Sequence, residues 1–192
     1  MPKKRDVRQV TDSRVLAAMA HPLRRRLVDL LKVDGPATAS MLAERTGEAV
    51  GNISHHMKVL AGSELVEVAP ELARDGRERW WRLVSASVRW SSRDFAGDPA
   101  GEAVELAAAS LGLQRQLELL NAWRAAGSES HEAWGDGPFA TDSWLRLTPD
   151  ELVQFSQELI GLIQRWADRD IPDDGAERES VFVFAHGIPA NP

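Results

Sequence analysis

The sequence predicts a mainly α-helical protein with one small β-hairpin, followed by a second helical region. Three observations support this fold class. Apolar residues recur at helical spacing up to residue 62, two alternating segments at 65–68 and 79–84 flank an Asp-Gly pair, and apolar helical patterns return after residue 100. With 192 residues, 43% of them hydrophobic, the chain can bury a sizeable core in one or two domains.

Charge is spread unevenly along the chain. Residues 1–89 contain 16 lysines and arginines and 11 acidic residues, whereas residues 90–192 contain 7 and 18. The overall net charge of −6 therefore combines a basic first part, which suggests a polyanionic partner, with an acidic second part.

The composition also excludes some classes of protein and site. The absence of cysteine rules out disulfides and thiolate metal sites. No run approaches the roughly 18 apolar residues of a membrane span, and the charged start lacks the apolar segment of a secretory signal. We therefore expect a cytoplasmic protein without a membrane partner.

The first 35 residues predict a basic lead and two helices. The lead contains Lys3, Lys4, Arg5 and Arg8. We interpret it as either a frayed terminus or an arm along a DNA backbone. A helix begins at residue 12 or 13, and Pro22 suits the first turn of the next one. The arginines at 24–26 oppose the dipole of that turn, so we expect either a neighbouring phosphate or carboxylate, or a solvated face.

Two further helices make a helix-turn-helix. Thr38 can cap a helix over residues 39–46, which ends at Gly47, and a second helix follows within residues 46–63. The predicted core stripe of the second helix consists of Val50, Ile53, Met57 and Leu60. Its opposite side carries small or hydrogen-bonding side chains and one cation, namely Gly51, Asn52, His55, Lys58 and Gly62, with Ser54 on its flank. A surface this slim and nearly uncharged can enter a DNA major groove.

Residues 64–85 predict a β-hairpin with a basic tip. Its strands lie at 65–68 and 79–84, and Gly76 supplies the positive φ of the turn. The arginines around the turn are Arg74, Arg77 and Arg79. Trp80 and Trp81 point to opposite faces of the second strand, so one is expected in the core and the other at an edge or interface.

Four motifs occur in order between residues 12 and 88. They read MAHPLRR at 19–25, LAERTG at 42–47, ISHHMKVL at 53–60, and RDGR at 74–77 with WWRL at 80–83. In this order they resemble the ArsR-type winged-helix repressors of bacteria. The resemblance implies a dimeric transcriptional regulator, with the helix of Asn52 and His55 in the major groove and the wing of Arg77 beside the backbone or in the minor groove.

Two departures from the family pattern limit what the resemblance implies. Ala49 stands where many relatives have a Ser or Thr cap, which costs roughly 0.5–2 kcal/mol unless Glu48 or Thr46 substitutes. Metal-sensing members generally use cysteines or clustered histidines and carboxylates, and this chain has no cysteine. We therefore predict no metal and no cofactor.

Double-stranded DNA is the expected partner, and residue types assign the contacts. Asn52 can pair with adenine, and Ser54 and His55 can reach base edges or phosphates. The cations expected to neutralise phosphates are Lys58, Arg74, Arg77 and Arg79. His56 points about 100° away from His55 on a helix, so it is expected between helices, and His21 is expected in a cap or packing role.

The predicted domains are a winged helix-turn-helix DNA-binding domain over residues 1–88 and a helical dimerisation or effector region over residues 89–192. Residues 85–92 carry turn signals and are expected to form a linker. The helix at 101–126 has an apolar band wide enough to pack on its own domain and on a second subunit.

Three features mark the last part of the chain. Thr148 starts a capping box, and the helix that it begins ends near Asp168. Residues 180–185 are apolar on both faces of a strand, so we expect them to pair with an edge of their own chain or of the partner. Three aromatic residues before Thr148 either wall a pocket for an unknown small-molecule effector or plug their loop onto the helices: Trp134, Phe139 and Trp144.

Together these features predict a sequence-specific DNA-binding transcriptional regulator, a repressor, acting as a homodimer on an inverted-repeat operator. The alternative is a winged-helix protein-protein interaction module without specific DNA binding, in which the acidic helical part is the working surface. An enzyme is not predicted, because the sequence has no recognisable nucleophile with its base, phosphate-binding glycine loop or ligand cluster.

Overall fold

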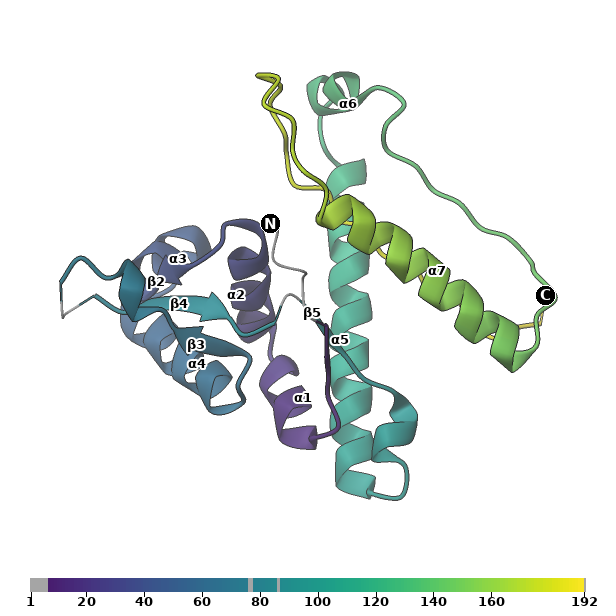
Figure 1. The fold of residues 1–192 in the computed structure, drawn as a ribbon, viewed down its shortest axis with the longest axis horizontal. Coiled ribbons are helices and arrows are strands. Elements are labelled where there is room, and N and C mark those ends of the chain that lie inside the picture. Colours follow the sequence, from purple (N-terminus) through teal and green to yellow (C-terminus); the bar gives the residue numbers. More distant parts are fainter. Residues whose placement is uncertain (1–6, 76–77, 86, 192) are drawn as a thin grey trace. The chain divides into compact units, whose positions relative to one another are not determined.

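The computed structural model describes residues 7–75, 78–85 and 87–191. It contains mainly helices and a small antiparallel sheet, as predicted (Figure 1). The described residues divide into two compact units, one within residues 7–114 and the other within residues 115–191. Within the described residues, no helix is long and apolar enough to cross a membrane. The functional division after residue 88 stays a prediction.

The first unit starts with a strand and two helices. These are β1 (Val7–Gln9), α1 (Ser13–Met19) and α2 (Pro22–Val33). The Asp12 side chain accepts a hydrogen bond from the Arg14 backbone N–H and so caps α1. Pro22 occupies the first turn of α2, where its missing N–H costs nothing. Both predicted helix starts are confirmed.

The predicted helix-turn-helix consists of α3 (Ala39–Thr46) and α4 (Val50–Gly62). The Thr38 hydroxyl caps α3 by accepting a hydrogen bond from the Met41 backbone N–H at 3.3 Å. Gly47 ends α3 with a left-handed backbone, at φ 76°, before the chain turns into α4. The helices α2, α3 and α4 pack around the small sheet (Figure 1).

The inner face of α4 lies in the hydrophobic core. Ile53, Met57 and Leu60 are fully buried, as predicted, and His56 joins them at 8% exposure. The prediction that Val50 belongs to the same stripe is wrong, because Val50 is 47% exposed. It is the first residue of α4 and follows an exposed turn, so it lies ahead of the part of the helix that the core covers.

The sheet has three antiparallel strands in the order β2-β4-β3. They are β2 (Ala37–Thr38), β3 (Val66–Val68) and β4 (Trp80–Leu83). β3 and β4 form the predicted hairpin, in which Val66 pairs with Leu83 and Val68 with Trp81.

The hairpin places its two tryptophans differently, as predicted. Trp81 is buried in the core, and Trp80 on the other face is half-buried. The loop between the strands begins with a short 3-10 helix, η1 (Pro70–Leu72). The predicted turn residues Gly76 and Arg77 lie outside the described residues.

The prediction of a linker at 85–92 is wrong in part, because ordered elements occupy this stretch. β5 (Ser87–Arg89) pairs in parallel with β1, and η2 (Ser92–Phe95) follows. Phe95 is 4% exposed and belongs to the core. Two three-residue strands from distant parts of the chain leave no local pattern, so the sequence did not indicate their pairing.

The remaining helices are α5 (Pro99–Arg124), α6 (Ser128–Trp134) and α7 (Pro149–Ala167). The predicted capping box of α7 is confirmed, because the Thr148 hydroxyl accepts from the Glu151 N–H and the Glu151 carboxylate accepts from the Thr148 N–H. The sequence predicts a loop over residues 128–147, and this prediction is wrong at the start of the segment, which α6 occupies.

Residues 180–185 do not form a strand. The prediction that they pair with an edge of their own chain is therefore wrong, since apolar residues alone do not supply the neighbouring edge that a strand needs. Pairing with an edge of a partner stays a prediction.

Replacing Gly47 with alanine tests the turn of the helix-turn-helix. A Cβ at Gly47 would meet no atom within 4 Å, so only the left-handed backbone resists the change. We expect Gly47→Ala to lower the free energy of unfolding by about 1 kcal/mol in urea denaturation. Gly62→Ala is the matched control, because Gly62 lies in α4 without a positive φ and has equal space. Equal effects of the two changes would contradict the assignment.

Candidate nucleic-acid interface

The outer face of α4 is a narrow polar strip. It comprises Gly51, Asn52, Ser54, His55 and Lys58, all of which are exposed except the half-buried Ser54 on its flank. The inner face of the same helix is buried, so the core decides which side of α4 reaches solvent. The predicted residues of this helix therefore do lie together on one surface.

The start of α4 has no side-chain cap. Ala49 has an extended backbone and no side-chain oxygen. Glu48 instead accepts a hydrogen bond from the Asn52 amide at 2.9 Å, and the Thr46 hydroxyl donates to the Leu42 carbonyl at 2.7 Å. Neither Glu48 nor Thr46 therefore replaces the missing cap. Among the described residues no side chain caps the first N–H groups of α4, and a phosphate suits such groups.

The hairpin of β3 and β4 carries arginines on both sides of its tip. Arg74 and Arg79 are exposed, whereas Arg77 lies outside the described residues. The Arg79 guanidinium lies 5.9 Å from the centre of the Trp81 ring, a cation-π distance that keeps it close to the sheet. The hairpin thus presents two exposed arginines among several carboxylates.

Glu78 organises the loop of this hairpin. Its carboxylate accepts hydrogen bonds from the Arg74 backbone N–H at 3.1 Å and from the Trp80 indole N–H at 3.2 Å. These two bonds, the first more than the second, lower the pKa of Glu78 and keep the carboxylate ionised. Sequence reasoning missed this role, because one glutamate in a loop of mixed charge makes no pattern.

The arginines at the start of α2 hold other helices. Arg24 donates to two carbonyls at the end of α1, and Arg26 donates to two carbonyls at the end of α3. Both cations therefore face the negative end of a helix dipole. The expectation of a carboxylate partner is wrong for these two residues, because they donate to backbone carbonyls of neighbouring helices. Arg26 is exposed, in agreement with the expected solvated face, whereas Arg24 is half-buried. A phosphate partner stays a prediction.

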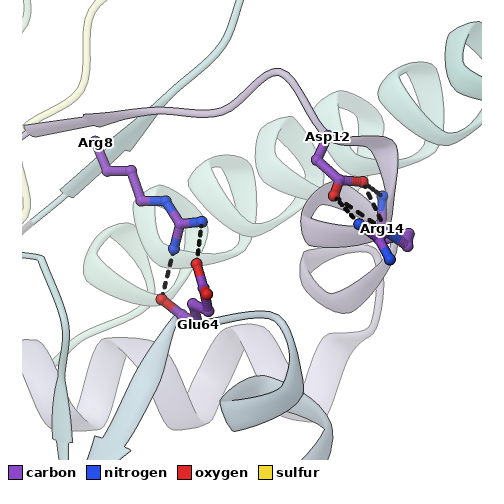
Figure 2. A network of polar contacts seen from close by, with 4 residues as sticks. All are labelled: Arg8, Asp12, Arg14 and Glu64. Carbon is purple, nitrogen blue, oxygen red and sulfur yellow. Dashed lines mark hydrogen bonds and ion pairs between the residues drawn. The ribbon is translucent and has the colours of Figure 1, made fainter.

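Arg8 is tied to the turn that follows α4 (Figure 2). Its guanidinium donates to the Glu64 backbone carbonyl at 2.6 Å and to the Glu64 carboxylate at 3.0 Å. Glu64 has a left-handed backbone, with φ 53°, and Arg8 binds both its main chain and its side chain. Figure 2 also shows the ion pair between Arg14 and Asp12 at the start of α1.

Neither predicted role of the basic lead therefore applies to Arg8, which is bound to the protein rather than frayed or placed along DNA. The other residues of the lead, Lys3, Lys4 and Arg5, lie outside the described residues.

Comparison with known proteins agrees with this architecture. Residues 19–69 match a family model described as a helix-turn-helix domain. No curated protein matches the chain. One similar solved structure is the homodimeric winged helix-turn-helix DNA-binding domain of a possible ArsR-family transcriptional regulator from Mycobacterium bovis. It is 24% identical over 55% of this chain and 80% of that one, with a TM-score of 0.33.

A second solved structure, a possible transcriptional regulator for arsenical resistance, is 31% identical. The match covers 59% of this chain and 97% of that one, with a TM-score of 0.32. The family match identifies a helix-turn-helix domain over residues 19–69 of this chain.

The other candidate site of this chain lies in the second unit. Trp134 is half-buried at the end of α6, whereas Phe139 and Trp144 are 77% and 67% exposed in the connection to α7. An effector pocket at these residues stays a prediction. Among the described residues, no group of three or more histidine or acidic side chains could hold a metal ion.

Gly51 offers a test that separates stability from DNA contact. A Cβ at Gly51 would meet no atom within 4 Å, and alanine favours a helix over glycine by roughly 0.5–1 kcal/mol. We expect Gly51→Ala to raise the free energy of unfolding while it weakens DNA binding, because the methyl group would project from the polar strip. Unchanged affinity in an anisotropy titration would place Gly51 away from the DNA.

Proposed function

We propose that this helix-turn-helix protein is an ArsR-type, sequence-specific DNA-binding transcriptional regulator that represses as a homodimer on an inverted-repeat operator. The observation that carries the proposal is the polar strip on α4, opposite a face that is held in the core. A helix of this kind fits the major groove, where each base pair presents a distinct set of donors, acceptors and methyl groups. Repression is the direction that the family resemblance implies.

Residue chemistry assigns roles along the strip. The Asn52 amide is proposed to pair with adenine, after it exchanges its hydrogen bond to Glu48 for bonds to the base. Glu48 is exposed, so water can replace Asn52 as its donor. Ser54 and His55 are proposed to contact base edges or phosphates, and Lys58 a phosphate.

The phosphate contacts are expected to be few, because several arginines of the first unit are engaged within the protein. Those that donate to protein oxygens include Arg8, Arg24, Arg26 and Arg82. The cations proposed for the DNA backbone are Lys58, Arg74, Arg77 and Arg79. Four phosphate contacts from each chain of a dimer correspond to a slope of about −7 in log affinity against log salt.

The dimer is proposed to form through α5. Leu106, Leu113 and Leu117 are 66%, 48% and 49% exposed, and their spacing places them on one side of the helix. Ala108 lies on the opposite side and is fully buried, so α5 already packs there. An apolar face on the free side of a packed helix suits an interface between two copies of the chain.

Two substitutions on α4 test the proposed readout. Binding to labelled DNA from upstream of the protein's own gene is compared with binding to a scrambled duplex over a salt series. Asn52→Ala is expected to lose roughly 1–3 kcal/mol of discrimination, because the base contact disappears. Lys58→Ala is expected to weaken binding to both duplexes and to flatten the dimer's salt slope by about 2, because each chain loses one phosphate contact.

Equal loss on both duplexes from Asn52→Ala would contradict its role in reading a base. If the wild-type chain binds no duplex even at low salt, the proposed function fails and the protein-protein interaction module becomes the better account.

A charge on the free side of α5 tests the dimer. Leu113→Glu is expected to shift the protein from dimer to monomer in light scattering after gel filtration, because a buried unpaired carboxylate opposes association. Ala122→Glu is the matched control, since Ala122 is exposed on the opposite side of the same helix. A Leu113→Glu protein that remains dimeric would exclude this face as the interface.

A further inference from the structure

Two histidines meet beneath the polar strip. His56 lies on the buried side of α4, at 8% exposure, and His21 is the residue directly before α2. The centres of their rings are 4.6 Å apart, with a tilt of 45°. His21 forms no side-chain capping bond with α2. The ring pair therefore connects the inner face of α4 to the start of α2.

Each ring has a buried nitrogen without a hydrogen bond. Among the described residues, neither Nδ1 of His21 nor Nδ1 of His56 has a partner, and both atoms are shielded from solvent. A neutral imidazole can leave one nitrogen as an unpaired acceptor at moderate cost. An imidazolium has two donors and a full charge, which are expensive to bury unpaired. The site thus favours two neutral rings over protonated ones.

The charged and titratable groups around the pair act mainly in the same direction. Burial first, then His21 and Arg24, lower the pKa of His56, and burial followed by Arg24 lowers the pKa of His21. His55, whose ring centre lies 5.4 Å from that of His56, adds to the lowering, and Glu48 opposes it as the smallest influence. These groups come from α2, from α4 and from the turn before α4.

We propose that the neutral His21–His56 pair positions α4, the helix proposed to enter the major groove. Protonation of the pair loosens α4 from α2 and weakens DNA binding in mild acid. This inference rests on the proposed DNA-binding function. It assigns His21 and His56 a role through α4, because neither belongs to the polar strip.

The direction of the pH effect follows from proton binding in the folded and unfolded chain. Folding lowers both pKa values, so the unfolded chain binds more protons than the folded chain just below the ordinary histidine value of 6.5. The stability that the neutral pair contributes is therefore complete above this value. It is lost progressively as the pH falls from 6.5 toward the folded-state pKa values.

DNA affinity and thermal unfolding of the full chain, measured from about pH 8 to about pH 5.5 at constant ionic strength, test the proposal. All the variants compared in this experiment also carry His55→Asn, because protonation of His55 on the polar strip would itself strengthen DNA binding. With the pair intact, affinity is expected to fall roughly tenfold over this range. The His21→Phe/His56→Phe double variant keeps two rings without the protons, so its affinity should change by less than about twofold.

His131→Asn is the matched control, since it removes an exposed histidine in the other unit and should leave the acid response intact. If the folded double variant loses as much DNA affinity in acid as the protein with the intact pair, the proposal is overturned.

Titration of the five histidines by NMR in the wild-type chain provides a second measurement if the double variant does not fold. Two imidazoles that titrate below the ordinary range, with loosening of α4 signals over the same range, support the proposal. Five ordinary titrations would overturn it. This measurement needs no DNA, so it separates failure of the histidine pair from failure of the proposed function, which would appear as no DNA binding at any pH.

Discussion

Burial of the inner face of α4 is the constraint on which the candidate interface depends. Ile53, Met57 and Leu60 are fully buried, and each such side chain contributes roughly 1.5–3 kcal/mol when it leaves water. Turning α4 about its axis would expose this stripe and bury the polar strip. The hydrophobic core therefore both stabilises the first unit and selects the side chains that face solvent.

The first unit has fewer cations available to a polyanion than its content of lysine and arginine suggests. Arg24 and Arg26 donate to the carboxyl ends of α1 and α3, and Arg8 holds the turn after α4. These contacts join helices and strands from different parts of the chain, so much of the basic charge supports the fold. The exposed cations Lys58, Arg74 and Arg79 lie on α4 and on the hairpin, the two elements that the family resemblance places at DNA.

The second unit differs in how it uses its apolar residues. α7 has a complete capping box, yet none of its residues is buried. Large apolar side chains such as Phe155, Trp166 and Phe182 remain exposed. An amphipathic helix draws most of its stability from packing of its apolar face, which favours completion of this unit by further contacts. This agrees with the proposal that two copies associate.

Local signals were sufficient for most of the fold. The caps at Thr38 and Thr148, Pro22 at the start of α2 and Gly47 at the end of α3 each act within about one helical turn, so neighbouring residues reveal them. Prediction failed where the outcome depends on distant segments. β2 pairs with β4 through only two residues, and β1 pairs with β5. Residues 180–185 do not form a strand despite their strand-like pattern.

The sequence by itself determined all the helices except α6, the hairpin and the polar strip of α4, because helical spacing separates polar from apolar faces before any tertiary contact forms. Only the tertiary structure decided that Val50 stays exposed, that Arg24 and Arg26 hold neighbouring helices, and that His21 meets His56. These outcomes depend on distances between segments that folding brings together, and no spacing along a single chain encodes them.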